Sequence, residues 1–145
     1  MWLLNVVTHQ LECFQGSTKP VYVILSHRWG EEEVTFQDIQ AGQGEHKQGY
    51  RKIDLCYKQA LREEGIFDHY YPKLLRGRPT HAWIDTCCID KTNSAELSEA
   101  INSMYHWYKE ARFCYAYLSD MVGYVSANDV GNSAWFSRGK FSYFR

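Results

Sequence analysis

Two short segments of the chain concentrate side chains that could bind a ligand or take part in catalysis. The first segment places a hydroxyl, an imidazole, a guanidinium and an indole side by side, in the order Ser26, His27, Arg28, Trp29 and Gly30. Arg28 could bind a phosphate or a carboxylate, or lie over the Trp29 ring in a cation–π contact. A structural reading carries about equal weight, with Ser26 bonding the backbone, Trp29 packing and Gly30 permitting a turn.

The second segment carries carboxylates, a hydroxyl, thiols and an ammonium group, on Asp85, Thr86, Cys87, Cys88, Asp90 and Lys91. Asp85 and Asp90 could bind a metal ion or polarise a sugar hydroxyl. We favour the structural reading, in which they bond loop amides and cap the next helix. Cys88 could pair with His27 as a nucleophile, but a cysteine is more often a small core residue.

Glu96 follows the second segment and is the remaining candidate for a catalytic carboxylate. Its place three residues after Asn93 also fits a capping box, and the helix dipole stabilises a negative charge at a helix start. The sequence lacks the glycine-rich phosphate loops, the HExxH zinc motif and the GxSxG nucleophile motif. We therefore assign no confident catalytic residue and no cofactor, and we expect no metal site.

Three apolar runs predict the strands that would position these segments. Residues 21–26 and 81–85 read as buried strands, and residues 113–118 read as a third strand. Residues 1–7 read as a first strand or a packed arm. Residues 35–49 contain three glycines and many polar residues, and we expect mostly loop there.

The spacing of apolar residues predicts two helices between these strands. The first helix covers residues 50–64 and ends at Gly65, and the second begins after Asn93 and runs to about residue 111. On the second helix we expect one buried apolar stripe, formed by Leu97, Ile101, Met104, Tyr108 and Ala111.

Strands that alternate with helices predict an α/β domain with a parallel sheet and helices on its faces. Ligands of such sheets bind beyond the carboxyl ends of the strands. That edge would hold residues 26–30, 85–93 and 119–120. Residues 66–80 follow neither periodicity and are interrupted by two prolines, so we expect an irregular insertion there.

Composition excludes several classes of protein. The net charge of −1 argues against a nucleic-acid binder, and no apolar run is long enough for a membrane span. The five cysteines are an odd number without a CxxC pair, which argues against a disulfide scaffold and a structural zinc site. We expect buried free thiols in a reducing, cytoplasmic compartment, and a single domain over residues 1–145.

Several stretches of the sequence resemble the motifs of the fungal heterokaryon incompatibility (HET) domain. Residues 22–36, YVILSHRWGEEEVTF, resemble the first motif. Residues 83–91, WIDTCCIDK, and residues 94–104, SAELSEAINSM, resemble the second. The approach to the third motif is matched by AYLSD at 116–120 and WFSRG at 135–139.

This resemblance implies a cytosolic protein of fungal non-self recognition, of the kind that triggers growth arrest and cell death when incompatible strains fuse. It implies partners that are like domains or other incompatibility proteins. The HET domain is also similar in fold to the three-layer Toll/interleukin receptor-like (TIR-like) domains, some of which cleave NAD. An NAD glycohydrolase that binds NAD at the edge formed by residues 26–30 and 85–93 is therefore the alternative.

The last motif departs from the family pattern. The family usually continues RGWTLQEL, whereas this chain reads RGKFSYFR from Arg138. Lys140 stands at the position of the expected tryptophan, and the glutamate that would be the catalytic acid has no counterpart. We therefore expect a C-terminally truncated domain, with residues 133–145 as an incomplete last motif, that acts by association and not as an enzyme.

Overall fold

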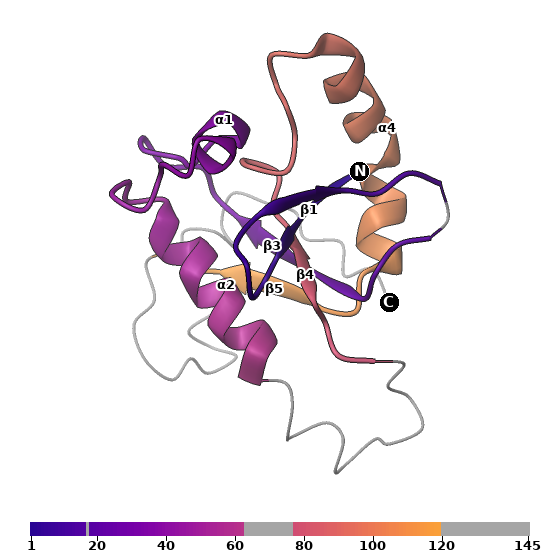
Figure 1. Ribbon diagram of the computed structural model, residues 1–145, viewed down its shortest axis with the longest axis horizontal. Helices are drawn as coiled ribbons and strands as arrows, with labels where there is room; N and C mark the ends of the chain where they lie inside the picture. Colours follow the sequence, from indigo (N-terminus) through magenta and orange to yellow (C-terminus); the bar gives the residue numbers. More distant parts are fainter. Residues whose placement is uncertain (17, 63–76, 120–145) are drawn as a thin grey trace.

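The computed structural model describes residues 1–16, 18–62 and 77–119 of the 145-residue chain. Its helices and strands (Figure 1) are β1 (Trp2–Asn5), β2 (Leu11–Cys13), β3 (Tyr22–His27), α1 (Phe36–Gln40), α2 (Tyr50–Arg62), β4 (His81–Trp83), α4 (Ser94–Glu110) and β5 (Cys114–Tyr117). Most of the insertion expected at 66–80 and all of the last motif at 133–145 lie outside the described residues.

In the described part of the chain, five strands form one sheet in the order β2-β1-β4-β3-β5. Strand β3 is parallel to both of its neighbours, β4 and β5, which confirms the α/β class and the three predicted strands, although β5 lies at an edge of the sheet and is only partly buried. Strand β1 runs antiparallel to β4 and to β2, so the sheet is mixed, and the predicted parallel arrangement holds for β4, β3 and β5.

A hairpin at the start of the chain explains the antiparallel pairs. Residues 6–10 join β1 to β2, and a connection this short can join only antiparallel neighbours. Asn5 stabilises the turn, because its side-chain oxygen accepts hydrogen bonds from the amides of Val7 (2.9 Å) and Thr8 (3.1 Å). Strand β1 matches the expected first strand, whereas β2 was missed because three residues show no clear alternation.

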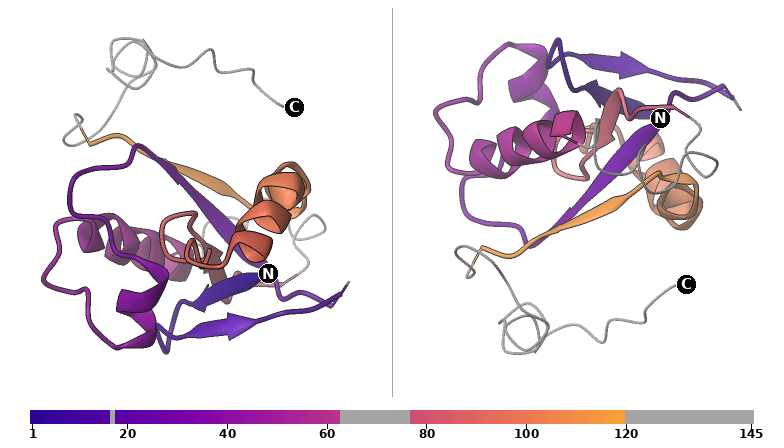
Figure 2. Two further views of the ribbon diagram at one scale, coloured as in Figure 1. Left: turned by 90° about the horizontal axis from the view of Figure 1, so that it is seen from above. Right: turned by 90° about the horizontal axis from the view of Figure 1, so that it is seen from below.

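Helices α2 and α4 lie on opposite faces of the sheet (Figures 1 and 2). On α2 the residues Ile53, Tyr57 and Ala60 are buried at the helical spacing that predicted this helix, and Leu61, which shares the spacing, is partly buried. Between the helices, Trp83 of β4 is fully buried and packs edge-on against Trp107 of α4, with ring centroids 5.5 Å apart. Within the described part of the chain, no helix has the length and apolarity needed to cross a membrane.

Helix α4 presents a different face to the sheet from the one predicted. Its buried residues are Ala100 and Trp107, while Ile101 is 61% exposed. Trp107 determines this orientation, because it packs on Trp83 and its carbonyl accepts a 2.8 Å hydrogen bond from the Tyr22 hydroxyl. The remaining predicted positions differ among themselves: Leu97, Met104 and Ala111 are partly buried, and Tyr108 is exposed.

A short helix, α1, lies within residues 35–49, where we expected mostly loop. Thr35 and Asp38 form a capping box, in which each side chain accepts a hydrogen bond from the other residue's amide. Lys47 closes the following loop through a 2.6 Å ion pair with Asp38. The Thr-x-x-Asp signal was present in the sequence, but a helix of five residues is too short to show a periodic apolar stripe.

Asn93 caps α4, but the reciprocal bond of the predicted capping box is absent. The Asn93 side chain accepts hydrogen bonds from the amides of Ala95 (3.1 Å) and Glu96 (3.3 Å). The Glu96 carboxylate instead accepts from the amide of Asp90, at 3.0 Å. Glu96 therefore ties the preceding turn to the helix.

Replacing this cap is expected to destabilise the protein. Asn93→Ala removes the acceptor for two helix amides, and we expect the free energy of unfolding to fall by about 1 kcal/mol. Urea denaturation measures the change. Asn102→Ala is the matched control, because Asn102 is exposed on the same helix and caps nothing, and an equal loss in both variants would contradict the capping role.

The five cysteines are all free, and their burial is mixed. Cys56, Cys87 and Cys88 are buried, as expected, but Cys13 and Cys114 are exposed because they lie on the two edge strands. Burial raises the pKa of Cys56 to about 12. Partial removal of the Cys114 thiol from water raises the pKa of that group as well.

A thiol-reactive reagent at neutral pH is expected to separate these two groups. Cys13 should react first and Cys114 more slowly in the native protein, while the three buried thiols should react only after denaturant is added. Mass spectrometry of the labelled peptides identifies the sites. Rapid labelling of Cys87 in the native protein would contradict the burial of this residue in the turn after β4.

Candidate functional site

The two segments singled out in the sequence meet at the carboxyl ends of β3 and β4. Trp29, just after β3, donates a 2.9 Å hydrogen bond from its indole nitrogen to the Asp85 carboxylate, just after β4. Lys91 lies over the same indole, with its ammonium 3.6 Å from the ring centroid. The predicted juxtaposition is therefore present, because β3 and β4 are parallel neighbours.

His27 ends β3 with a side chain that is fully buried. Its Nε2 atom lies 3.7 Å from a carboxylate oxygen of Asp85 and 3.9 Å from one of Glu33. Its Nδ1 atom lies 3.4 Å from the carbonyl oxygen of Leu25. Nε2 and the two facing carboxylate oxygens are buried and make no hydrogen bond, which is rare for buried polar atoms.

Glu33 and Lys52 join His27 and Asp85 in one group of neighbouring side chains, the His27 cluster. Neither Glu33 nor Lys52 was identified as a site residue from the sequence. The other Glu33 oxygen accepts hydrogen bonds from the Gly30 amide and from the Lys52 ammonium, which also donates to the Arg28 carbonyl at 3.3 Å. Lys52 is buried on α2 beside Ile53. A lysine on the apolar face of a helix was the available signal, because a buried lysine requires a partner.

Trp29 and its neighbours differ from both readings of the first segment. A cation–π contact is present at Trp29, but its cation is Lys91, so the prediction that Arg28 lies over this ring is wrong. Arg28 is exposed, and Trp29 is 56% exposed despite its bond to Asp85. Ser26, the first residue of this segment, is half-buried and lies within β3 itself.

The remaining candidates of the second segment serve the turn that follows β4. The Cys88 thiol accepts from the Ile84 amide at 3.3 Å and contacts the Ala82 carbonyl at 3.7 Å, and none of the contacts described for it reaches His27. Thr86 is buried. Asp90 accepts from the amide and hydroxyl of Thr92, at 3.0 and 2.6 Å, which fits the bonding to loop amides that we favoured, but Asn93 and not Asp90 caps α4.

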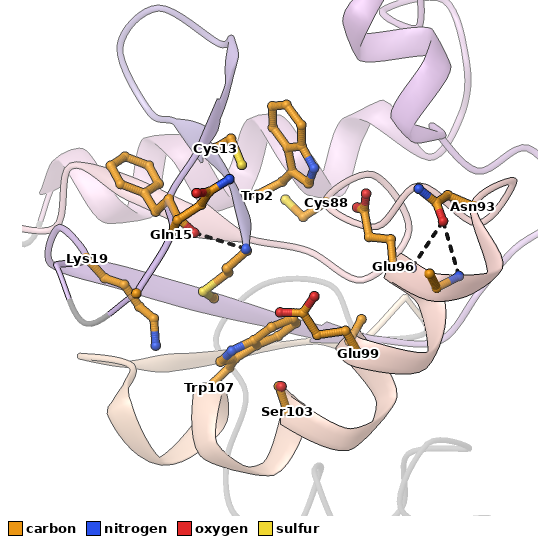
Figure 3. A pocket seen from close by; sticks show the side chains of 15 residues that line it. Trp2, Cys13, Gln15, Lys19, Cys88, Asn93, Glu96, Glu99, Ser103 and Trp107 are labelled. Carbon is orange, nitrogen blue, oxygen red and sulfur yellow. Dashed lines mark hydrogen bonds between the residues drawn. The ribbon is translucent and has the colours of Figure 1, made fainter.

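Glu96 lies away from the His27 cluster, in a cleft of about 700 Å³ between the β1–β2 hairpin and α4. Figure 3 shows Trp2 and Trp107 on opposite sides of this cleft. No residue of the His27 cluster lines it. Among the described residues, no group of three or more histidine, cysteine or acidic side chains is arranged to hold a metal ion.

The pKa of His27 is lowered below its usual value of 6.5, because burial and then the charge of Lys52 outweigh the attraction of Asp85 and Glu33. In the unfolded chain this imidazole titrates near its usual pKa, so the unfolded state takes up the proton first as the pH falls. The native state therefore has a stabilising contribution that is complete above pH 6.5 and is lost as the pH falls toward the folded pKa.

This linkage predicts a stability that depends on His27. We expect the urea midpoint of the wild-type protein to fall between about pH 7.5 and about pH 5.5, and to fall less in His27→Gln. His46→Gln is the control, since His46 is exposed, and it should behave like the wild type. The same pH dependence in His27→Gln and the wild type would contradict the linkage.

Comparisons with known proteins place these motifs in one family. The model of the "Heterokaryon incompatibility protein (HET)" family matches residues 22–138. The chain is 48% identical over 118 residues to vegetative incompatibility protein HET-E-1 of Podospora anserina, which covers 80% of this chain and 8% of that protein. No solved structure matches, so the expected likeness to TIR-like folds gains no support, and neither match names NAD. The chain belongs to the heterokaryon incompatibility (HET) family.

Proposed function

We propose that this chain acts in fungal non-self recognition, as a cytoplasmic HET domain whose engagement leads to growth arrest and cell death. The observation that carries the proposal is the 48% identity over 118 residues to a vegetative incompatibility protein. The matched region includes the residues that form the His27 cluster, because the family match begins at residue 22 and ends at residue 138. We further propose that residues 1–145 form one domain.

The domain acts by association with like domains or with other incompatibility proteins. We assign this role to a recognition surface made of Arg28, Trp29 and Lys91, which are exposed at the carboxyl edge of the sheet. Tryptophan and arginine are the residues most enriched among those that dominate binding energy at protein interfaces. The half-buried Asp85 carboxylate holds Trp29 in place before a partner arrives.

Charge of both signs at this surface favours a second copy as the partner. Glu31 and Glu32 are exposed and follow Arg28 within four residues of the sequence. In a two-fold symmetric contact the same patch faces itself, so the cations of one copy can lie opposite the acidic residues of the other.

Light scattering over a range of protein concentrations tests the association. We expect a mass that rises with concentration for the wild type, and a monomer for Arg28→Glu. Arg51→Glu makes the same charge change at an exposed position of α2 and should associate as the wild type does. A wild type that stays monomeric, or equal association in both variants, would count against the recognition surface.

Expression in a fungal host tests the biological role. We expect the wild-type chain and Arg51→Glu to reduce growth and viability, and Arg28→Glu to be tolerated at the same protein level. Normal growth with abundant folded wild-type protein would contradict a role of this chain in cell death.

A further inference from the structure

The imidazole of His27 is surrounded by hydrogen-bond acceptors on both of its nitrogens. Nδ1 faces the carbonyl oxygen of Leu25 at 3.4 Å, and Nε2 faces one oxygen each of Asp85 and Glu33 at 3.7 and 3.9 Å. A neutral imidazole carries one proton, so one of its nitrogens must face acceptors with a lone pair. Only the doubly protonated ring has a donor for each side.

The ammonium groups near this ring do not supply the hydrogen-bond donor that the unprotonated ring nitrogen lacks. The Lys52 ammonium from α2 is bonded to the other oxygen of Glu33 and to the Arg28 carbonyl. The Lys91 ammonium, from the turn before α4, lies over the Trp29 ring. Among the described residues, the charged groups that act on His27 are the carboxylates of Asp85 and Glu33 and the ammonium of Lys52, while Lys91 acts on the two carboxylates.

Protonation of His27 changes both the charge of the ring and its distances to the carboxylates of Asp85 and Glu33. A distance of 3.7 to 3.9 Å is too long for a hydrogen bond, whereas an imidazolium and a carboxylate bond at about 2.7–2.9 Å. A proton on Nε2 therefore draws the carboxylates of Asp85 and Glu33 toward the ring. Burial and Lys52 oppose this step at neutral pH, which leaves the neutral form as the resting state.

Asp85 connects this buried event to the surface. One of its carboxylate oxygens faces His27, and the other accepts the hydrogen bond from the Trp29 indole. Trp29 in turn carries the Lys91 ammonium on its ring. A movement of the Asp85 carboxylate thus changes the position of two of the three residues of the recognition surface.

We propose that His27 is a proton-sensitive switch that sets the position of the exposed Trp29–Lys91 pair through the Asp85 carboxylate. The regulatory meaning of the switch rests on the function proposed above, but the coupling between His27 and Trp29 is a property of the single chain. Acidification draws Asp85 inward and rearranges Trp29 and Lys91, so binding at that surface becomes dependent on pH.

Nuclear magnetic resonance of the full chain at a concentration where it is monomeric tests the coupling. The Trp29 indole signal, identified by its loss in Trp29→Phe, and the His27 ring signals, identified by their loss in His27→Gln, are followed from neutral to acidic pH. We expect the two to titrate with one shared midpoint below 6.5. In His27→Gln the indole signal should stay constant, and in His46→Gln it should titrate as in the wild type.

The shared midpoint is measured in the wild-type protein, so the test holds even if His27→Gln does not fold. An indole signal that stays constant while His27 titrates would overturn the switch. So would different midpoints, or a His27 ring that takes up no proton before the protein unfolds. If the midpoints coincide but light scattering shows no association, the switch stands and the function assigned to the surface is wrong.

Discussion

Trp83→Ala is expected to lower the free energy of unfolding by about 4 kcal/mol, because large-to-small changes of buried aromatic residues cost about 3–5 kcal/mol. Trp83 is fully buried on β4, next to β3, where it pairs with Ile24. Its ring packs edge-on against Trp107 and Tyr108 of α4, at centroid distances of 5.5 and 6.0 Å. The substitution therefore removes the contact that fixes the face of α4 on the sheet.

Urea denaturation followed by far-ultraviolet circular dichroism measures this loss. A domain of this size has about 5–15 kcal/mol of stability, so we expect Trp83→Ala to be partly unfolded or close to it at room temperature. Trp29→Ala is the control, because more than half of its side chain is exposed, and we expect a loss of about 1 kcal/mol or less. Similar losses in the two variants would show that Trp83 is not at the centre of the core.

Lys52→Met is expected to cost about 3 kcal/mol, the low end of the cost of removing one partner of a buried ion pair. The side chain of Lys52 is 6% exposed and that of Glu33 is 14% exposed, so little water can replace the lost ammonium. The carboxylate of Glu33 would remain beside Asp85, and the Arg28 carbonyl would lose its donor. The methionine fills the space of the lysine, which leaves charge as the main difference.

A second lysine on α2 provides the matched control for this variant. Lys58 pairs with Asp54 on the same helix, but both side chains are more than a third exposed, and Lys58→Met should change the stability by about 0.5 kcal/mol or less. Adding Glu33→Gln to Lys52→Met should recover part of the loss, because it removes the unpaired charge. No recovery in the double variant would indicate that packing, and not charge, determines the effect.

The sequence predicted the parts of the fold that depend on local apolar patterns. Strands β3 and β4 were found because each is a short continuous apolar run, and helix α2 was found because its apolar residues recur at helical spacing. The buried face of α4 was predicted wrongly because apolar residues occur around much of that helix, and contact with Trp83 selects among them. Such a choice depends on a residue of another element, which periodicity within the helix does not contain.

The candidate site was likewise predictable only in part. Parallel strands bring their carboxyl ends together, so the meeting of His27 and Trp29 with Asp85 followed from topology. Glu33 and Lys52 could not be paired in the same way. Nineteen positions separate them in the sequence, and only the packing of α2 on the sheet brings them into contact.

The N-terminal hairpin has a consequence for the order in which this protein folds. Its two strands are synthesised before β4 and can pair with each other at once, but β1 also pairs with β4, where Leu4 lies opposite Ala82. The edge of β1 that pairs with β4 therefore stays unpaired until residues 81–83 have been synthesised. Pairings this distant in sequence form slowly, and an unpaired strand edge is open to other chains in the meantime. A nascent chain held back before β4 is made is thus the form most exposed to misassembly with its own copies.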